Sequence, residues 1–289
     1  MKPKTIYPIT FLTALLIFTA TPFLKSQEMY QSERLTKLWE TKEGLKTPES
    51  VLYNPKDKVL YVANINGKAW EKDGNGFISK LSLGGDFIST DWVTGLNAPK
   101  GMGIYKGKLF VTDIDEVAEI DVVTAKITNH YKNEKAVNLN DIAVGKDGTV
   151  YVSDTGSKCI FYLKDGKLEV FIESDQIAKT NGLFVNGDEL LAGLSNSAVS
   201  INLKTKEVKM FVDQTGYIDG FVATGNGSFL ISDWQGHIQQ IKPGKSSIKL
   251  LDTTPQKINA ADIEFITTDK MLLVPAFLND KVVAYKLKL

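Results

Sequence analysis

The chain has 289 residues, with 34 Lys and Arg against 34 Asp and Glu, so its formal net charge is zero. The balanced charge gives no reason to expect a nucleic-acid partner, and a hydrophobic share of 43% indicates a globular protein rather than a disordered or fibrous one. A single Cys excludes an intramolecular disulfide, and two His with one Cys cannot form a typical zinc site.

The first residues have the order of a targeting segment. Lys2 and Lys4 precede the apolar run 9–18 (ITFLTALLIF), which is shorter than the about 20 residues that a membrane-spanning helix needs. This order predicts a secretory signal peptide over residues 1–26 and a mature domain over residues 27–289, located in the periplasm or secreted. The alternative is an uncleaved N-terminal anchor. No later segment is expected to cross a membrane.

After this segment, one phrase recurs six times at steps of about 40 to 50 residues. It consists of a short polar or glycine-containing motif, an alternating apolar run, a turn rich in Gly, Asp, Asn and Lys, and a second apolar run. Examples of the second run are VLYVAN (59–64), VYVSD (150–154) and FLISD (229–233). Units of about 40–45 residues with four short strands are typical of β-propeller blades.

The sequence therefore predicts an all-β fold, a six-bladed β-propeller with four-stranded blades in a single domain. Helical periodicity is almost absent, which argues against a parallel α/β fold. The run 34–40 (RLTKLWE) precedes the first motif, and only three runs follow the sixth. The N-terminal strand is thus expected to complete the last blade and close the ring. The alternative, an irregular β-sandwich, does not account for six units in phase.

Each motif is expected to open the innermost strand of its blade, so that one polar side chain per blade reaches one end of the central channel. These residues are Glu49, Lys100, Asn140, Asn181, Asp219 and Asp262. Buried polar groups need partners, and two carboxylates about 6 Å apart repel by roughly 3 kcal/mol at an effective dielectric constant near 20. A bound cation would remove that repulsion. Carboxylate and amide oxygens without His or Cys favour a hard divalent metal, Ca²⁺ above Mg²⁺.

Four of these motifs resemble those of the six-bladed propeller family that includes gluconolactonase, senescence marker protein (regucalcin) and, more distantly, diisopropyl-fluorophosphatase. The resemblance covers residues 34–289 and rests on Pro48-Glu49, Asn140-Asp141, Asn181-Gly182 and Asp219-Gly220. It implies that Glu49, Asn140, Asn181 and Asp219 surround a catalytic divalent metal, usually calcium. It also implies that Asn140 contacts the substrate, that Asp219 acts as base or nucleophile, and that a lactone is hydrolysed.

Two features depart from that family. The lactonase branch has an Arg before the third-blade Asn that helps to hold sugar hydroxyls, whereas residues 136–139 here read AVNL, which argues against an aldonolactone. Lys100 is also unusual in such a ring. It could pair with Glu49 or Asp262, reach a substrate carboxylate, turn outward into the sheet, or occupy the metal position and leave the site metal-free.

The loops that follow the second strands are expected to rim the same face. The excess length of the first unit lies in residues 65–76 (INGKAWEKDGNG), a candidate lid that carries Trp70. Trp234 and Phe277 occupy equivalent rim positions in two other units. With Lys100 and Asp262, these aromatics are the candidate substrate-binding residues, an apolar wall over a polar floor. The alternative for the aromatics is packing between blades.

Other polar groups have simpler interpretations. Asp113 and its counterparts at the ends of later second strands are expected to accept backbone hydrogen bonds in turns, although a polar contact to substrate is the alternative. His237 lies near the rim and is a weaker candidate for a general base. His130 is expected on the surface and Cys159 in the core.

Two functions follow from these patterns. The first is a calcium-dependent hydrolase of a lactone or similar ester, with a small-molecule substrate and with Asp219 and Asn140 as catalytic residues. The second is a non-catalytic propeller that binds a small ligand or a protein in the periplasm, which Lys100 and the missing Arg favour and which the fold alone would allow. A strictosidine-synthase-like enzyme has little support at the level of residues. The substrate and the oligomeric state do not follow from the sequence.

Overall fold

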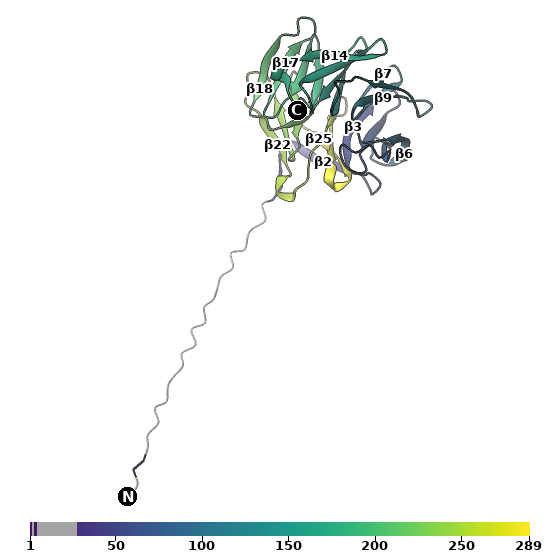
Figure 1. Cartoon of the computed structure of the whole chain (residues 1–289). Coiled ribbons are helices and arrows are strands. Elements are labelled where there is room, and N and C mark those ends of the chain that lie inside the picture. Colours follow the sequence, from purple (N-terminus) through teal and green to yellow (C-terminus); the bar gives the residue numbers. More distant parts are fainter. Residues whose placement is uncertain (2, 5–27) are drawn as a thin grey trace.

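The structure, a computed structural model, describes residues 1, 3–4 and 28–289 and arranges six β-sheets around a central axis (Figure 1). The predicted six-bladed propeller is therefore confirmed. The predicted signal peptide, residues 1–26, lies outside the described residues except for three positions. In the part of the chain that is described, no helix has the length and apolar character needed to cross a membrane.

Each blade is an antiparallel sheet whose first strand lies at the axis and whose last strand lies at the outside. Blade 1 consists of β3 (Pro48–Asn54), β4 (Val59–Asn64), β5 (Gly76–Ser82) and β6 (Phe87–Leu96). Blade 2 consists of β7 (Pro99–Tyr105), β8 (Lys108–Asp113), β9 (Glu116–Asp121) and β10 (Lys126–Lys132). Blade 3 consists of β11 (Leu139–Val144), β12 (Val150–Asp154), β13 (Cys159–Lys164) and β14 (Lys167–Glu173).

The second half of the ring follows the same plan. Blade 4 consists of β15 (Leu183–Asn186), β16 (Glu189–Gly193), β17 (Ser197–Asn202) and β18 (Val208–Asp213). Blade 5 consists of β19 (Ile218–Ala223), β20 (Phe229–Asp233), β21 (His237–Ile241) and β22 (Ile248–Asp252). Blade 6 takes β23 (Glu264–Ile266), β24 (Met271–Ala276) and β25 (Lys281–Leu287) from the C-terminus. Short 3-10 helices are η1 (Asp175–Ile177), η2 (Thr254–Gln256) and η3 (Phe277–Asn279).

The N-terminal strand closes the ring, as the sequence predicts. Strand β2 (Leu35–Glu40) pairs with β25 from Leu35↔Leu287 to Glu40↔Val283, which gives blade 6 its fourth strand (Figure 1). A further short strand, β1 (Tyr30–Gln31), pairs with β22 and adds a fifth strand to blade 5. The segment before the first blade therefore joins blades 5 and 6, and it pairs an outer edge that would otherwise stay open.

The core lies between the blades. Strands of period two place apolar side chains on both faces of each sheet, and neighbouring sheets bury them against each other. Between blades 1 and 2, for example, Tyr61 and Ile78 share a buried cluster with Val111 and Ile120. Each of the other five interfaces holds a comparable cluster of described residues. Cys159 is buried in the cluster between blades 2 and 3, as expected.

Carboxylates at the ends of second strands hold the chain where it enters the inner strand. The backbone N–H groups of Asn97 and Ala98 donate to the Asp113 carboxylate at 2.9 and 2.8 Å. Asp154 accepts from Val137 and Asn138 in the same way. These carboxylates position the loops that precede the axis-facing strands, which is the turn role expected from the sequence.

Candidate active site at one end of the central channel

The inner strands of four blades contain an irregular step where they begin. The pairing register between the first and second strands breaks at this point in four blades, at 48–50, 99–102, 139–142 and 218–221. A bulge of this kind re-aims a side chain that would otherwise lie on one face of the sheet. The motif residues at these breaks are Glu49, Lys100, Asn140 and Asp219.

The position after the motif residue brings neighbouring inner strands together. A Cβ atom on Gly101 would lie 2.5 Å from the Cα of Asp141, and one on Gly182 would lie 2.5 Å from the carbonyl oxygen of Asp219. Gly220 is equally crowded by the next blade. In these three blades glycine follows the ring residue because only a missing side chain allows this approach between backbones.

A cavity of about 250 Å³ opens at this end of the channel. It brings together five of the six predicted ring residues and all three predicted rim aromatics. The predicted residues that line it are Glu49, Lys100, Asn140, Asn181, Asp219, Trp70, Trp234 and Phe277. Four further residues line it. Ile65 and Ala69 belong to the predicted lid, whereas Thr155 and Tyr217 were not predicted as site residues.

Asp262 does not belong to this ring, contrary to the sequence prediction. It lines a separate cavity inside the channel, together with Ser50 and Asp141, and its backbone pairs with Ser50 in a parallel bridge. The ring position of blade 6 is instead Ala261, whose carbonyl accepts from the second-strand hydroxyl of the preceding blade, Ser232 Oγ, at 2.7 Å. The sequence prediction placed the ring position of blade 6 one residue too far along the chain, at Asp262 instead of Ala261. Neighbouring residues of a strand point to opposite faces, so this shift of one residue reverses the predicted side-chain direction.

Tyr217 adds a phenol to the polar side of the cavity. Burial and the neighbouring Asp219 carboxylate raise the pKa of Tyr217 to about 12, so the phenol is neutral at physiological pH. It precedes Asp219 by two residues and lies just ahead of β19. The sequence signal for Tyr217 as a site residue was its position as a polar aromatic just before the blade-5 motif. That position does not distinguish a site residue from an ordinary loop residue.

The two ring carboxylates are desolvated. Burial raises the pKa of Asp219 to about 7, and burial together with the nearby Asp219 charge holds the pKa of Glu49 well above its usual range. Asn181 Nδ2 donates to Asp219 Oδ1 at 2.9 Å and partly offsets the cost for Asp219. Glu49 Oε2 and Asn181 Oδ1 are buried and have no hydrogen-bond partner. Such orphan oxygens are uncommon in folded proteins, since each carries an uncompensated desolvation cost.

Lys100 points into the site rather than outward into the sheet. Its side chain is 2% exposed, and its ammonium donates to the carbonyl oxygens of Ala69 at 2.6 Å and Ala98 at 2.8 Å. The ammonium also lies 4.0 Å from the centre of the Trp70 ring, a cation–π distance. Burial lowers the pKa of Lys100 to about 8, and the opposite charge of Glu49 limits that fall.

The donors around the cavity fit a hard cation. Glu49, Asn140, Asn181 and Asp219 offer carboxylate and amide oxygens only, and two of those oxygens lack a partner. Within the described residues, no group of three or more His, Cys, Asp or Glu side chains is close enough to hold a metal. A cation at this site would therefore need the amide oxygens of Asn140 and Asn181 in addition to the two carboxylates, and Lys100 adds a positive charge beside these donors.

The opposite side of the cavity is apolar. Trp234 and Phe277 meet edge to face with ring centres 4.6 Å apart, and Phe277 belongs to a buried cluster with Ile65 and Ala261. Trp70 is 41% exposed on the blade-1 loop, which a 2.5 Å ion pair between Lys72 and Asp115 ties to blade 2. The predicted apolar wall is present, with Trp70 at its open edge.

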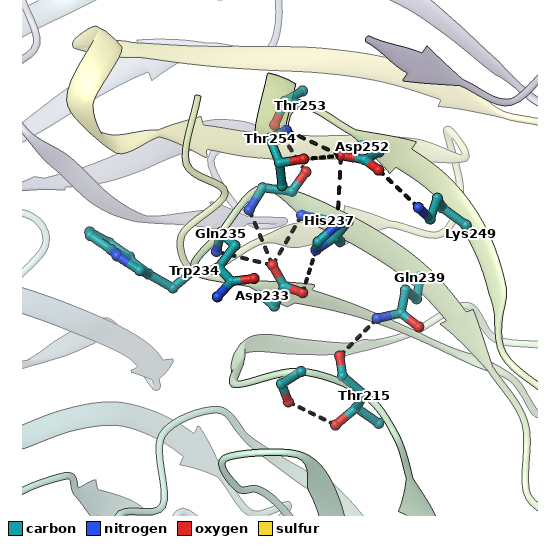
Figure 2. A network of polar contacts seen from close by, with 12 residues as sticks. Thr215, Asp233, Trp234, Gln235, His237, Gln239, Lys249, Asp252, Thr253 and Thr254 are labelled. Carbon is teal, nitrogen blue, oxygen red and sulfur yellow. Dashed lines mark hydrogen bonds and ion pairs between the residues drawn. The ribbon is translucent and has the colours of Figure 1, made fainter. Parts of the chain in front are cut away.

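His237 lies behind the rim and does not line the cavity. Its Nδ1 is 2.7 Å from Asp233 Oδ2, and its Nε2 is 3.6 Å from Asp252 Oδ1 (Figure 2). Asp252 also pairs with Lys249. His237 therefore links the ends of β20 and β22, and the structure does not bring it to the site as a base. The other histidine, His130, is on the surface as expected, where it pairs with Glu116.

Comparisons with known proteins identify the fold. No protein-family profile matches the chain, and no curated protein gives a significant match. A catalytically inactive virginiamycin B lyase from Staphylococcus aureus, solved with quinupristin, matches with a TM-score of 0.62 and 14% identity, over 90% of this chain and 100% of that chain. A structural-genomics target described as a candidate gluconolactonase gives 0.65 and 15%, over 88% and 92%. The WD40 β-propeller domain of Doa1 gives 0.61 and 11%, over 82% and 77%. Such low identities show a shared propeller architecture alone.

Proposed function

We propose that the protein is a periplasmic or secreted hydrolase that uses a divalent cation, Ca²⁺, to cleave a lactone or a similar ester. The observation that carries the proposal is the pair of buried, unpartnered oxygens, Glu49 Oε2 and Asn181 Oδ1, in a cavity that Asp219 and Asn140 also line. A cation bound to this set would satisfy both oxygens and remove the repulsion between the carboxylates. The candidate gluconolactonase among the structural neighbours supports the reaction class.

The ion, held by Glu49, Asn140, Asn181 and Asp219, would supply Lewis-acid stabilisation of the negative charge that develops on the ester oxygen. The chain's own groups do the rest. Asp219, which lines the cavity beside Asn181, would accept the proton of an attacking water. The Asn181 amide orients that carboxylate through the 2.9 Å hydrogen bond. Trp234 and Phe277 hold the apolar part of the substrate and exclude water from that side.

The test is a hydrolysis assay on lactones, simple esters and phosphotriesters, with the protein first treated with chelator and then supplied with Ca²⁺. The variants Glu49→Gln and Asp219→Asn should lose turnover by a factor of at least about 100. The matched controls are Glu134→Gln and Asp188→Asn, at exposed positions that do not line the cavity. Absence of metal-dependent turnover on every compound of the panel would refute the proposal.

A second function is favoured by one observation. Lys100 already places a positive charge beside the two carboxylates, so part of the charge balance exists without a metal. A non-catalytic propeller that binds a ligand or a protein in the periplasm would use the cavity in this state. It predicts that Glu49→Gln and Asp219→Asn change ligand affinity or stability while no turnover is detected with or without Ca²⁺.

A further inference from the structure

We propose that Lys100 is a specificity residue that anchors an anionic group, a carboxylate, on the substrate of this site. The proposal rests on the hydrolase function above, because it names the class of molecule that the same cavity takes. It begins from the ammonium of Lys100, a buried charge that lines the cavity from the second blade.

The first argument concerns the hydrogen bonds of that ammonium. An ammonium has three N–H donors, and two are satisfied by the carbonyl oxygens of Ala69 and Ala98. Among the described residues, the only oxygen acceptors bonded to this ammonium are these two carbonyls, and the Trp70 ring faces it at 4.0 Å. One N–H therefore has no oxygen or nitrogen acceptor and is available to a molecule in the cavity. Charge-assisted hydrogen bonds to a carboxylate are about twice as strong as neutral ones, so this donor favours an anion.

The second argument concerns how the ammonium is held. Ala69 and Trp70 belong to the blade-1 loop, and the Trp70 ring lies 4.0 Å from the ammonium on the open side of the cavity. Ala98 fixes the ammonium from the backbone just before its own strand, β7. The charge is thus fixed in place rather than mobile at the end of an exposed side chain. A pre-oriented donor binds its partner without the entropic cost of ordering a free lysine.

The third argument is charge balance. Among the side chains that line the cavity, two ring carboxylates and a divalent cation sum to zero. Lys100 then adds one positive charge, which the Asp113 carboxylate outside the lining offsets only in part. A buried net charge is costly unless a counter-charge accompanies it. A monoanionic substrate brings the lining to neutrality, whereas a neutral lactone leaves Lys100 with that partial offset alone.

The experiment measures binding rather than turnover, so that it does not depend on catalysis. The probes are tetrahydrofuran-2-carboxylate and its neutral match, tetrahydrofuran-2-carboxamide, which have a ring but no scissile ester. Binding is followed by tryptophan fluorescence and by calorimetry, in Ca²⁺ and in chelator. The wild-type protein should bind the carboxylate at least about tenfold more tightly than the carboxamide, as one charged hydrogen bond of 1.5 kcal/mol or more requires.

The variant Lys100→Met removes the charge and keeps the length of the side chain, and it should reduce that preference to within about twofold. Its control is Lys106→Met, which removes an exposed lysine from the turn of the same hairpin and should keep the preference. Thermal unfolding shows whether each variant is folded. If Lys100→Met is unfolded, the wild-type comparison in chelator decides the matter, because no Ca²⁺ is then present to bind the carboxylate probe directly. Equal affinity of the wild-type protein for the two probes in both conditions would overturn the proposal.

The outcomes also separate this proposal from the hydrolase proposal. Metal-dependent hydrolysis of neutral lactones with no preference for the carboxylate probe leaves the hydrolase and removes the anion anchor. A Lys100-dependent preference that persists in chelator, without turnover on any ester, supports the anchor and leaves a binding protein.

Discussion

Replacing Asp219 by Asn is expected to stabilise the metal-free protein at pH 8 although it removes a residue that the site needs. Burial raises the pKa of Asp219 from 3.8 to about 7. Because the folded pKa is the higher one, the unfolded chain loses its proton first, and the folded state loses stability as the pH rises through this window. A rise of about three pKa units corresponds to about 4 kcal/mol at pH 8, and to about 1.5 kcal/mol at pH 5. The variant carries no charge at either pH and keeps an oxygen that can accept from Asn181.

The assay is urea unfolding of both proteins at pH 5 and pH 8, in chelator and in Ca²⁺. In chelator, the free energy of unfolding of Asp219→Asn should exceed that of the wild type at pH 8. The difference between the two proteins should be smaller at pH 5. Ca²⁺ at 100 times its Kd at each pH should stabilise the wild type by about 2.7 kcal/mol, while the variant binds the ion poorly. The order should therefore reverse at pH 5, and at pH 8 the advantage of the variant should shrink to about 1 kcal/mol. Two results would contradict this reasoning: a variant that is less stable than the wild type in chelator at pH 8, or a difference in unfolding free energy that does not grow with pH. Either would show that the metal-free protein compensates the cost of burying the Asp219 carboxylate.

Three further predictions follow from the packing and charge of the ring. Gly101→Ala places a Cβ 2.5 Å from the Asp141 Cα and should cost about 1–3 kcal/mol or more in urea unfolding, whereas Gly84→Ala, whose nearest contact is 3.6 Å, should cost under about 1 kcal/mol. Removal of residues 1–40 deletes β2 and should abolish cooperative unfolding. Removal of residues 1–33 deletes only the two-residue pairing of β1 and keeps β2, so it should cost little. Burial lowers the pKa of Lys100 to about 8, against the raising effects of Glu49 and Asp113, so carboxylate affinity should fall about tenfold between pH 7 and pH 9. A flat affinity profile from pH 6 to 10 would contradict that charge assignment.

The fold could be predicted from the sequence because propeller blades are built from local pairings. Each hairpin has its own alternating apolar runs and a turn, so the repeat unit is visible without knowledge of distant contacts. Ring closure was also predictable, since blade 6 lacks one run and the segment at Leu35 supplies it. Strand β1 was not, because a two-residue pairing of Tyr30–Gln31 with the end of β22 leaves no periodic pattern.

Predicting the site residues required knowing which residue of each motif faces the channel. The residue two positions after the ring residue gives this information. In five blades that residue is buried in the cluster shared with a neighbouring blade, namely Val51, Met102, Ile142, Leu183 and Phe221. The same rule applied to blade 6 selects Ile263, which is buried in its own interface cluster, and so assigns Ala261 to the ring. The carboxylate of Asp262 is prominent in sequence and led to the wrong register, whereas the apolar neighbour carries the geometric information.

This register has a consequence for what the cavity can hold. With Ala261 in the sixth position, the ring has a polar arc over blades 1 to 5, from Glu49 to Asp219, and one apolar sector. Phe277 and Trp234 extend that apolar sector beyond Ala261, and Ile65 packs against it from the loop after β4 in blade 1. A substrate that fits both halves has an oxygen-rich reactive end over the ring and an apolar side against blade 6. A polyhydroxylated sugar lactone, polar on all sides, would leave hydroxyl groups unpaired against Phe277 and Trp234, each at a cost of about 1–3 kcal/mol. The geometry of the ring therefore disfavours sugar lactones independently of the missing Arg.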